Sequence, residues 1–214
     1  MKYLLLLGAG LLSRPAQAQL GLRLGGNLLH IASDDSLATS SRLGYQVGLF
    51  YQVQLTQRFS LVPEVQFSGE RVQVSSAEAA ASPQTAYQLR FSYLNVPVLA
   101  RVELAPLYVE AGPQVSWLVG GRGEGAYTAG SNVVGRIDQA LTERYRRFDA
   151  GLCVGVGVKL PANLGLNLRL YQGLVNMVRQ VGPPYSVEAI PYVGRSNQRR
   201  QTLQVALTYQ LPNK

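Results

Sequence analysis

The feature of this sequence that most constrains its fold is a strict alternation of apolar and non-apolar side chains over long segments. Between residues 43 and 55 every odd position is Leu, Tyr or Val, whereas the even positions are Gly, Gln or Phe. Between residues 148 and 160 every even position is apolar, and the odd positions carry Asp, Gly, Cys or Lys. Because successive side chains of a β-strand point to opposite faces, this period of two predicts an all-β protein.

The same alternation predicts eight strands that are long enough to cross a membrane. Most of them have at least the roughly 9–11 residues that a tilted membrane-spanning strand requires. The expected strands are 20–30, 42–55, 59–69, 87–102, 107–119, 147–160, 164–172 and 200–211.

Short and long connections between these strands alternate without exception. The short ones are 56–58, 103–106 and 161–163; the long ones are 31–41, 70–86, 120–146 and 173–199. This pattern is typical of an outer-membrane barrel with short periplasmic turns and long outer loops, and an even strand number places both termini in the periplasm. We therefore expect an eight-stranded antiparallel up-and-down transmembrane β-barrel, with no second domain.

The rival fold is a soluble up-and-down barrel that encloses a ligand, as in lipocalins. Such a barrel needs a charged outer surface, but only 15% of the residues here are charged, against about 25% in average soluble domains. The non-apolar strand positions are mostly Gly, Gln, Ser, Asn and Cys. These residues suit a narrow polar interior, so the composition favours the membrane barrel.

The first 18 residues match a secretory signal peptide. Lys2 provides the positive start, residues 4–12 form an apolar stretch of nine residues, and Ala16-Gln17-Ala18 is an A-x-A cleavage site. Nine apolar residues are too few to span a bilayer as a helix. We expect residues 1–18 to be cleaved, residues 19–214 to form the barrel domain, and the mature protein to lie in the bacterial outer membrane.

A small set of charged residues falls on the inward face of the expected barrel. An eight-stranded barrel is just wide enough for side chains to fill it, and charges buried there need partners. We interpret the set as a salt-bridged plug; the alternative is a path for ions or protons. The expected lumen network comprises Arg23, Glu64, Arg101, Glu110, Asp149, Lys159 and Arg169.

A second set of charges, all arginines, flanks the expected outer loops. Arginine binds phosphate oxygens two at a time through its planar guanidinium. We expect contacts with the phosphates of outer-membrane lipid or lipopolysaccharide, with solvated loop charges as the alternative. These candidates are Arg144, Arg146, Arg147, Arg199 and Arg200. Elsewhere Lys and Arg are scattered singly, which argues against nucleic acid as a partner.

Residues for catalysis, metal binding or cofactor binding are sparse. The single histidine, His30, precedes Ser33, Asp34, Asp35 and Ser36, a set that would suit a lipid A-modifying enzyme only as a remote alternative. The lone Cys153 lies among glycines and is interpreted as a small lumen filler. We expect no catalytic residue, no metal site and no cofactor.

Four stretches resemble the porin-like outer-membrane β-barrel family that includes the PorT-like proteins of Gram-negative bacteria. They are SYLNVPVL at 92–99, YVEAGP at 108–113, FDAG at 148–151 and RLYQGLVN at 169–176. The chain departs from that pattern at Asn95, where an acidic residue is expected, and in its tail at 210–214, which lacks a terminal aromatic residue. The resemblance implies the same fold and location.

These observations lead to one functional hypothesis with named alternatives. The expected protein is a monomeric structural or surface-interaction scaffold with a filled lumen, inserted by the barrel-insertion machinery. A narrow porin is one alternative. An accessory component of an outer-membrane secretion system, with secretion proteins as partners, is the alternative that the PorT-like resemblance implies.

Overall fold

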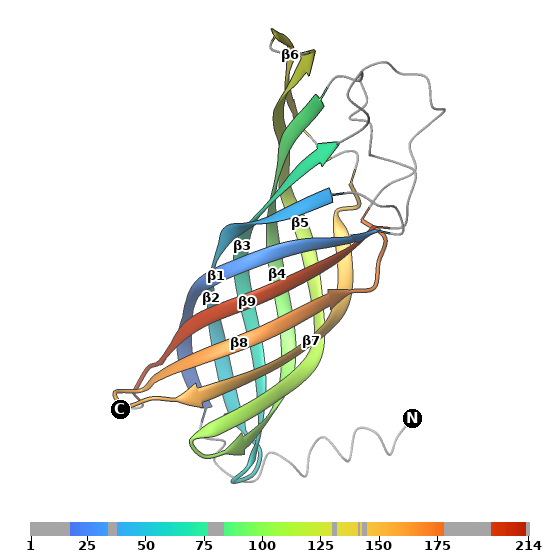
Figure 1. Cartoon of the computed structure of the whole chain (residues 1–214). Coiled ribbons are helices and arrows are strands. Elements are labelled where there is room, and N and C mark those ends of the chain that lie inside the picture. Colours follow the sequence, from blue (N-terminus) through green and yellow to red (C-terminus); the bar gives the residue numbers. More distant parts are fainter. Residues whose placement is uncertain are drawn as a thin grey trace, which may run out of the picture.

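The computed structural model describes residues 18–33, 38–76, 84–129, 132–140, 142, 145–177 and 198–212. In these residues nine strands form one antiparallel sheet (Figure 1). The strands are β1 (Ala18–Ser33), β2 (Ala38–Gln54), β3 (Phe59–Ser76), β4 (Gln84–Leu104), β5 (Leu107–Ala129), β6 (Asn132–Ala140), β7 (Phe148–Lys159), β8 (Leu164–Gly173) and β9 (Gln198–Gln210).

The sheet closes on itself, and eight of the nine strands make the barrel wall. β1 pairs with both β2 and β9, and β4 pairs with both β3 and β5. The first part of β5 also pairs with β7. Among the described residues, β6 pairs with the last part of β5, which extends beyond the barrel wall. The predicted eight-stranded antiparallel barrel is therefore confirmed.

All four predicted long loops are partly strand; in 31–41, for example, β1 runs on to Ser33 and β2 begins at Ala38. β3 runs on to Ser76 and β4 begins at Gln84, so the hairpin extends well into the expected loop 70–86. The expected loop 120–146 likewise holds the end of β5 and all of β6. Pairing satisfies the backbone donors and acceptors of both arms, so the ladders continue past the apolar part of the wall.

The predicted short turns all lie at one end of the barrel, with the first and last described strand residues. Ala18 pairs opposite Val53 beside the β2–β3 turn, and the Leu211 amide donates to the Leu20 carbonyl. The turn between β7 and β8 is closed by a hydrogen bond from the Leu160 amide to the Leu164 carbonyl. We call this end the inner end and the opposite end, which carries the long connections, the outer end.

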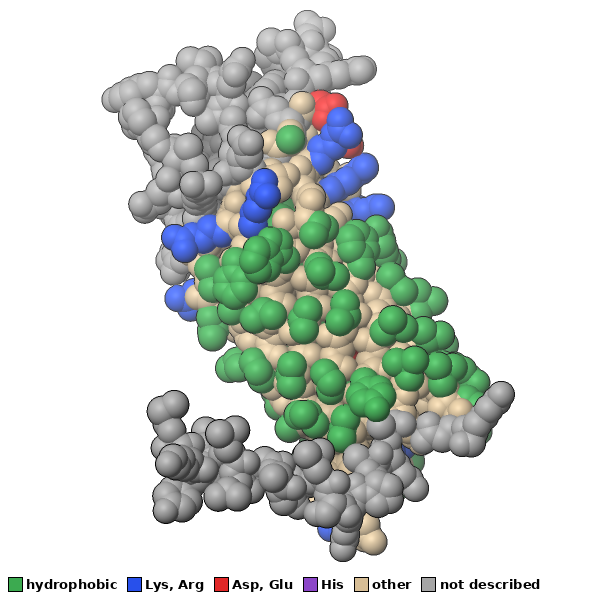
Figure 2. All heavy atoms as spheres, turned by 180° about the vertical axis from the view of Figure 1, so that it is seen from behind, with side chains coloured by type: hydrophobic (Ala, Val, Ile, Leu, Met, Phe, Trp, Pro, Cys, Tyr) green, Lys and Arg blue, Asp and Glu red, His purple; other side chains and the backbone are tan. Residues whose placement is uncertain are grey.

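The outward face of the wall is a belt of exposed apolar side chains (Figure 2). Leu43 is 71% exposed and Leu24 is 65% exposed, and outward Leu, Val and aromatic residues of the other wall strands repeat the pattern. An apolar surface of this extent is unfavourable in water and matches lipid, which excludes the soluble alternative. Among the described residues, no helix has the length and apolarity to span a membrane.

The inward face is crowded, and its glycines make room for large neighbours. A Cβ added to Gly21 would lie 2.2 Å from the Phe50 ring, and one added to Gly157 would lie 2.2 Å from the Tyr108 ring. These close approaches require glycine. The alternation of glycine with bulky residues therefore fills a narrow interior.

The orientation of the barrel leads to a test with protease on intact cells. We expect trypsin to cut within loops 120–146 and 173–199, which join strands at the outer end, and to leave the turn at Arg58 intact. Immunoblotting of fragment sizes would measure this, with lysed cells as the control in which Arg58 becomes accessible. Cleavage at Arg58 in sealed cells would contradict the expected topology.

Candidate functional site

The lumen holds charged side chains because each of them occupies an inward position of an alternating strand. On β3, for example, Val65 and Phe67 face outward while Glu64 and Gln66 are buried. The charged residues come from strands on all sides of the barrel and form two groups at different depths. We call them the inner charge cluster and the outer charge cluster.

The inner charge cluster is centred on the guanidinium of Arg169. Its Nη2 atom lies 2.9 Å from Glu64 Oε1 and 2.6 Å from Glu110 Oε1. Arg101 Nη2 lies 2.8 Å from Glu110 Oε2, and Arg23 Nη1 lies 3.9 Å from Glu64 Oε1. All five side chains are 4% exposed or less. The cluster contains three cations and two carboxylates, and charge-assisted hydrogen bonds connect most of them.

Polar neighbours add hydrogen bonds to this cluster, although Arg23 Nε and Nη1 have no hydrogen-bond partner among the described residues. Asn167 donates to Glu110 Oε1 over 3.0 Å, and Gln66 donates to Glu64. Arg101 also donates to Gln52 Oε1 over 3.2 Å, and its guanidinium stacks 4.1 Å from the centre of the Tyr108 ring. A charge in a confined interior is stable only when it is paired in this way.

The outer charge cluster is centred on Arg200 of β9. Its Nε atom donates to Glu70 Oε2 over 2.9 Å, and its Nη1 lies 3.7 Å from Asp149 Oδ2. The guanidinium lies 4.0 Å from the centre of the Tyr93 ring and 4.9 Å from that of Tyr171. Arg200 and Glu70 are fully buried. The guanidinium of Arg200 thus pairs with two carboxylates and packs on two aromatic rings.

Beyond the outer charge cluster the lumen becomes apolar. Phe91 and Tyr145 pack edge to face with ring centres 4.9 Å apart, and the neighbouring residues are almost completely buried. The group extends from the level of the outer charge cluster, where Phe91 pairs opposite Glu70, toward the outer end, and we call it the apolar cap. It comprises Leu29, Ile31, Val72, Leu89, Phe91, Tyr93, Leu118, Tyr145 and Met177. The apolar cap was not predicted from the sequence, because several of its residues lie in segments that were expected to be loops.

The structure brings five of the seven predicted lumen charges together and places the other two elsewhere. Arg23, Glu64, Arg101, Glu110 and Arg169 form the inner charge cluster, with the ion pairs described above. Asp149 is buried in the lumen but belongs to the outer charge cluster.

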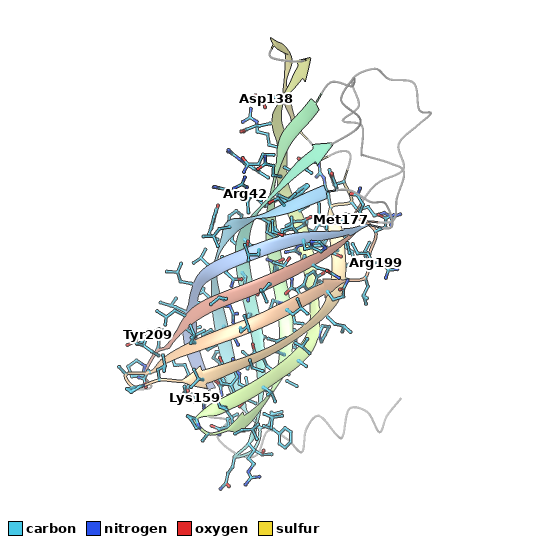
Figure 3. All side chains as sticks on the ribbon, in the orientation of Figure 1. Arg42, Asp138, Lys159, Met177, Arg199 and Tyr209 are labelled. Carbon is cyan, nitrogen blue, oxygen red and sulfur yellow. The ribbon has the colours of Figure 1, made fainter. Side chains whose placement is uncertain are left out.

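Lys159 is the predicted lumen charge that lies outside both clusters. It sits 45% exposed at the inner end, where it pairs with Glu103 over 2.7 Å (Figure 3). The prediction that Lys159 lies in the lumen is therefore wrong. Lys159 is the last residue of β7, and its long side chain reaches the mouth of the barrel.

Among the predicted lipid contacts, the placement of Arg200 on the outer rim is wrong. Arg200 is buried in the lumen because it has the same parity as Thr202 and Gln204, which face inward, and Arg199 is the outward residue. Glu70, its partner, was missed because the third strand was expected to end at residue 69. Both follow the inward parity of their strands, so the signal was present in the sequence.

The remaining predicted rim residues are exposed where the structure describes them. Arg146, Arg147 and Arg199 are exposed at the outer end, and Arg144 lies outside the described residues. His30 is exposed on the outward face of β1, and Asp34, Asp35 and Ser36 fall outside the described ranges. Cys153 is buried in the lumen, where its Sγ atom donates to Gln114 Oε1 over 3.1 Å.

Comparisons with known proteins agree with this architecture. The family model described as "Outer membrane protein beta-barrel domain" matches residues 13–179, which is more than half of the chain. No curated protein sequence matches the chain.

Similar solved structures have low sequence identity to this chain. Neisserial surface protein A is 12% identical with a TM-score of 0.47, over 91% of this chain and 99% of that one. Ail of Yersinia pestis, solved with the heparin analogue sucrose octasulfate, is 11% identical with a TM-score of 0.44 over the same shares. OprG of Pseudomonas aeruginosa is 10% identical with a TM-score of 0.44, over 92% and 98%. Because the family model matches more than half of the chain and the chain forms a closed barrel, this chain belongs to the family of outer membrane protein β-barrel domains.

Proposed function

We propose that this protein is a sealed outer-membrane barrel that acts as a structural and surface-interaction scaffold. The observation that carries the proposal is the filling of the lumen. Two charge clusters lie one above the other, and the apolar cap extends from the outer one toward the outer end. An eight-stranded barrel has no width to spare beyond such side chains.

Two barriers oppose conduction through this interior. A passing ion would have to displace charge-assisted hydrogen bonds of Arg169 or Arg200, which are among the stronger polar contacts in proteins. It would then cross the apolar cap, and hydrophobic constrictions exclude water and ions. A lumen that is closed in this way supports display of the outer hairpins as the role of the protein.

A planar-bilayer recording tests the proposal. We expect the purified barrel to show no stepwise conductance, because both barriers lie in series along the axis. A large porin reconstituted by the same procedure provides the positive control for insertion and detection. Regular conductance steps from this protein would overturn the sealed scaffold and support the narrow-porin alternative.

The exposed rim arginines remain part of this proposal. Arg146, Arg147 and Arg199 lie at the outer end, and Arg146 and Arg147 directly precede Phe148, which packs against Trp117 of the neighbouring strand. Aromatic residues of a membrane barrel lie at headgroup depth. We propose that these three arginines contact lipid phosphates there, and Arg200 is no longer a candidate.

A further inference from the structure

Four arginines form an uninterrupted row on the outward face of four neighbouring wall strands. Arg42 of β2 pairs opposite Arg71 of β3, Arg71 pairs opposite Arg90 of β4, and Arg90 pairs opposite Arg122 of β5. All four are exposed. The sequence did not predict the row, because its members lie 19 to 32 residues apart along the chain and only the strand register aligns them. We call the set Arg42, Arg71, Arg90 and Arg122 the arginine row.

The arginine row is electrostatically unfavourable by itself. Neighbouring strands are about 4.8 Å apart, and like charges directly opposite each other destabilise a sheet. Here three such pairs follow one another. A concentration of like charge of this kind is stabilised by an anion that several guanidiniums share.

Acidic side chains compensate only one half of the row. Arg122 forms a two-pronged ion pair with Asp138 of β6, with Nε 2.7 Å from Oδ1. This hydrogen bonding raises the pKa of Arg122, so the residue stays charged. Arg90 lies 3.2 Å from Glu124. Four cations against two carboxylates leave the patch with a net charge of +2.

Within the described ranges, the other half of the row has no acidic partner. Arg42 donates only to the uncharged amide oxygen of Gln73, with Nε 3.1 Å from Oε1. Among the residues that the structure describes, no carboxylate lies within 4.0 Å of Arg42 or Arg71. Arg42 and Arg71 are therefore the part of the row that is available to an external anion.

The position of the row identifies the source of that anion. Two residues below Arg71 and Arg90 come the small residues Gly69 and Ser92, and two residues further come Phe67 and Leu94 of the apolar belt. Tyr45 and Phe67 pack with ring centres 6.3 Å apart at that level. Figure 2 shows arginine side chains immediately above the belt. The row thus lies just outside the hydrocarbon region, at the depth of lipid headgroups.

We propose that the arginine row binds the phosphate groups of anionic lipids in the outer leaflet, with Arg42 and Arg71 as the principal contacts. The inference rests on the proposed placement of the barrel with its long hairpins outside, and it assigns a lipid partner to one side of the wall. Guanidinium groups about 5 Å apart hold phosphate oxygens in pairs. The Tyr45 ring lies over Gly69, where an added Cβ would be 2.5 Å from it, so the aromatic residues border the headgroup on the side of the lipid chains.

The experiment compares lipid selection by folded variants in membranes of defined composition. The barrel is reconstituted in phosphatidylcholine vesicles that contain a minor fraction of lipopolysaccharide or of phosphatidylglycerol, and the bound lipid is quantified by native mass spectrometry. We expect R42Q/R71Q to reduce the preference for the anionic lipid by about tenfold, since basic residues near an anionic surface each contribute measurably. We expect E124Q/D138N to increase it, because this double substitution frees Arg90 and Arg122.

Matched variants separate the site from a general effect of charge. R58Q/K159Q removes the same charge from exposed positions at the inner end, and we expect it to leave the preference for the anionic lipid nearly unchanged. Free inorganic phosphate and a soluble sulfated polysaccharide serve as competitors, and neither should displace the lipid. Retained lipid preference in R42Q/R71Q, equal losses in both double variants, or displacement by the soluble polysaccharide would each overturn the proposal.

Folding and the sealed lumen are checked separately. Heat-dependent gel mobility reports whether each variant is a folded barrel, and the substituted side chains are exposed, so folding should be unaffected. If the parent protein gave no conductance and also showed no preference for anionic lipid, only the proposal for the arginine row would be contradicted. Conductance with intact lipid selection would contradict only the sealed scaffold.

Discussion

Replacing Arg200 by Met is expected to lower the free energy of unfolding by about 3–5 kcal/mol, the range for breaking a buried ion pair. The substitution leaves Glu70 and Asp149 in the lumen without a cation, since no other ion pair reaches either carboxylate within the described residues. It also removes the guanidinium from the faces of Tyr93 and Tyr171. Urea titration of the reconstituted barrel, followed by tryptophan fluorescence, measures the change.

The next residue along the chain provides the control for this substitution. Arg199 is exposed on the outward face, so R199M should change the free energy of unfolding by no more than about 0.5 kcal/mol. R200M/E70Q should regain part of the loss, because it removes one of the two carboxylates that R200M leaves unpaired. If R200M and R199M were equally stable, the outer charge cluster would contribute nothing to folding.

Replacing Glu110 by Gln is expected to lower the free energy of unfolding by about 3 kcal/mol or more. Glu110 accepts hydrogen bonds from Arg101, Arg169 and Asn167. Without this charge, Arg101 loses the carboxylate it pairs with, and Arg23 and Arg169 share the single carboxylate of Glu64. Gln has nearly the same shape as Glu, so the loss would report the charge and not a cavity. The same urea titration gives the value.

The outer hairpin contains a matched Glu-to-Gln control. Glu124 is 38% exposed and pairs with exposed arginines, and such surface pairs contribute at most about 1 kcal/mol. The free energy of unfolding of E124Q should therefore be close to that of the parent protein. Equal effects of E110Q and E124Q would mean that water screens the lumen charges, and the inner charge cluster would then not seal the barrel.

The period of two in the sequence was sufficient to predict the strands and their faces. Side chains of a strand alternate whatever the strand packs against, so Leu43 and Leu152 could be assigned to the lipid side and Glu64 and Glu110 to the lumen. The strict alternation of short and long connections likewise determined the up-and-down order. The closed barrel confirms both predictions.

The ends of the strands could not be predicted as well. Residues 70–76 continue the alternation, with Val72 buried and Arg71 exposed, but their polar composition resembles a loop. Pairing with the opposite arm of the hairpin makes them strand. Glu70 and Arg200 were missed or misplaced for this reason, because each lies at the point where a strand was expected to end or begin.

The sequence by itself determined which residues face the lumen, the lipid and the outer end, since these depend on parity and on local turns. Only the tertiary structure decided which charges meet. Arg169 and Glu64 are 105 residues apart, and Arg200 and Glu70 are 130 apart. Their contacts depend on the closure and the stagger of the barrel strands. The same register aligns four separate arginines into one row, which no local pattern could reveal.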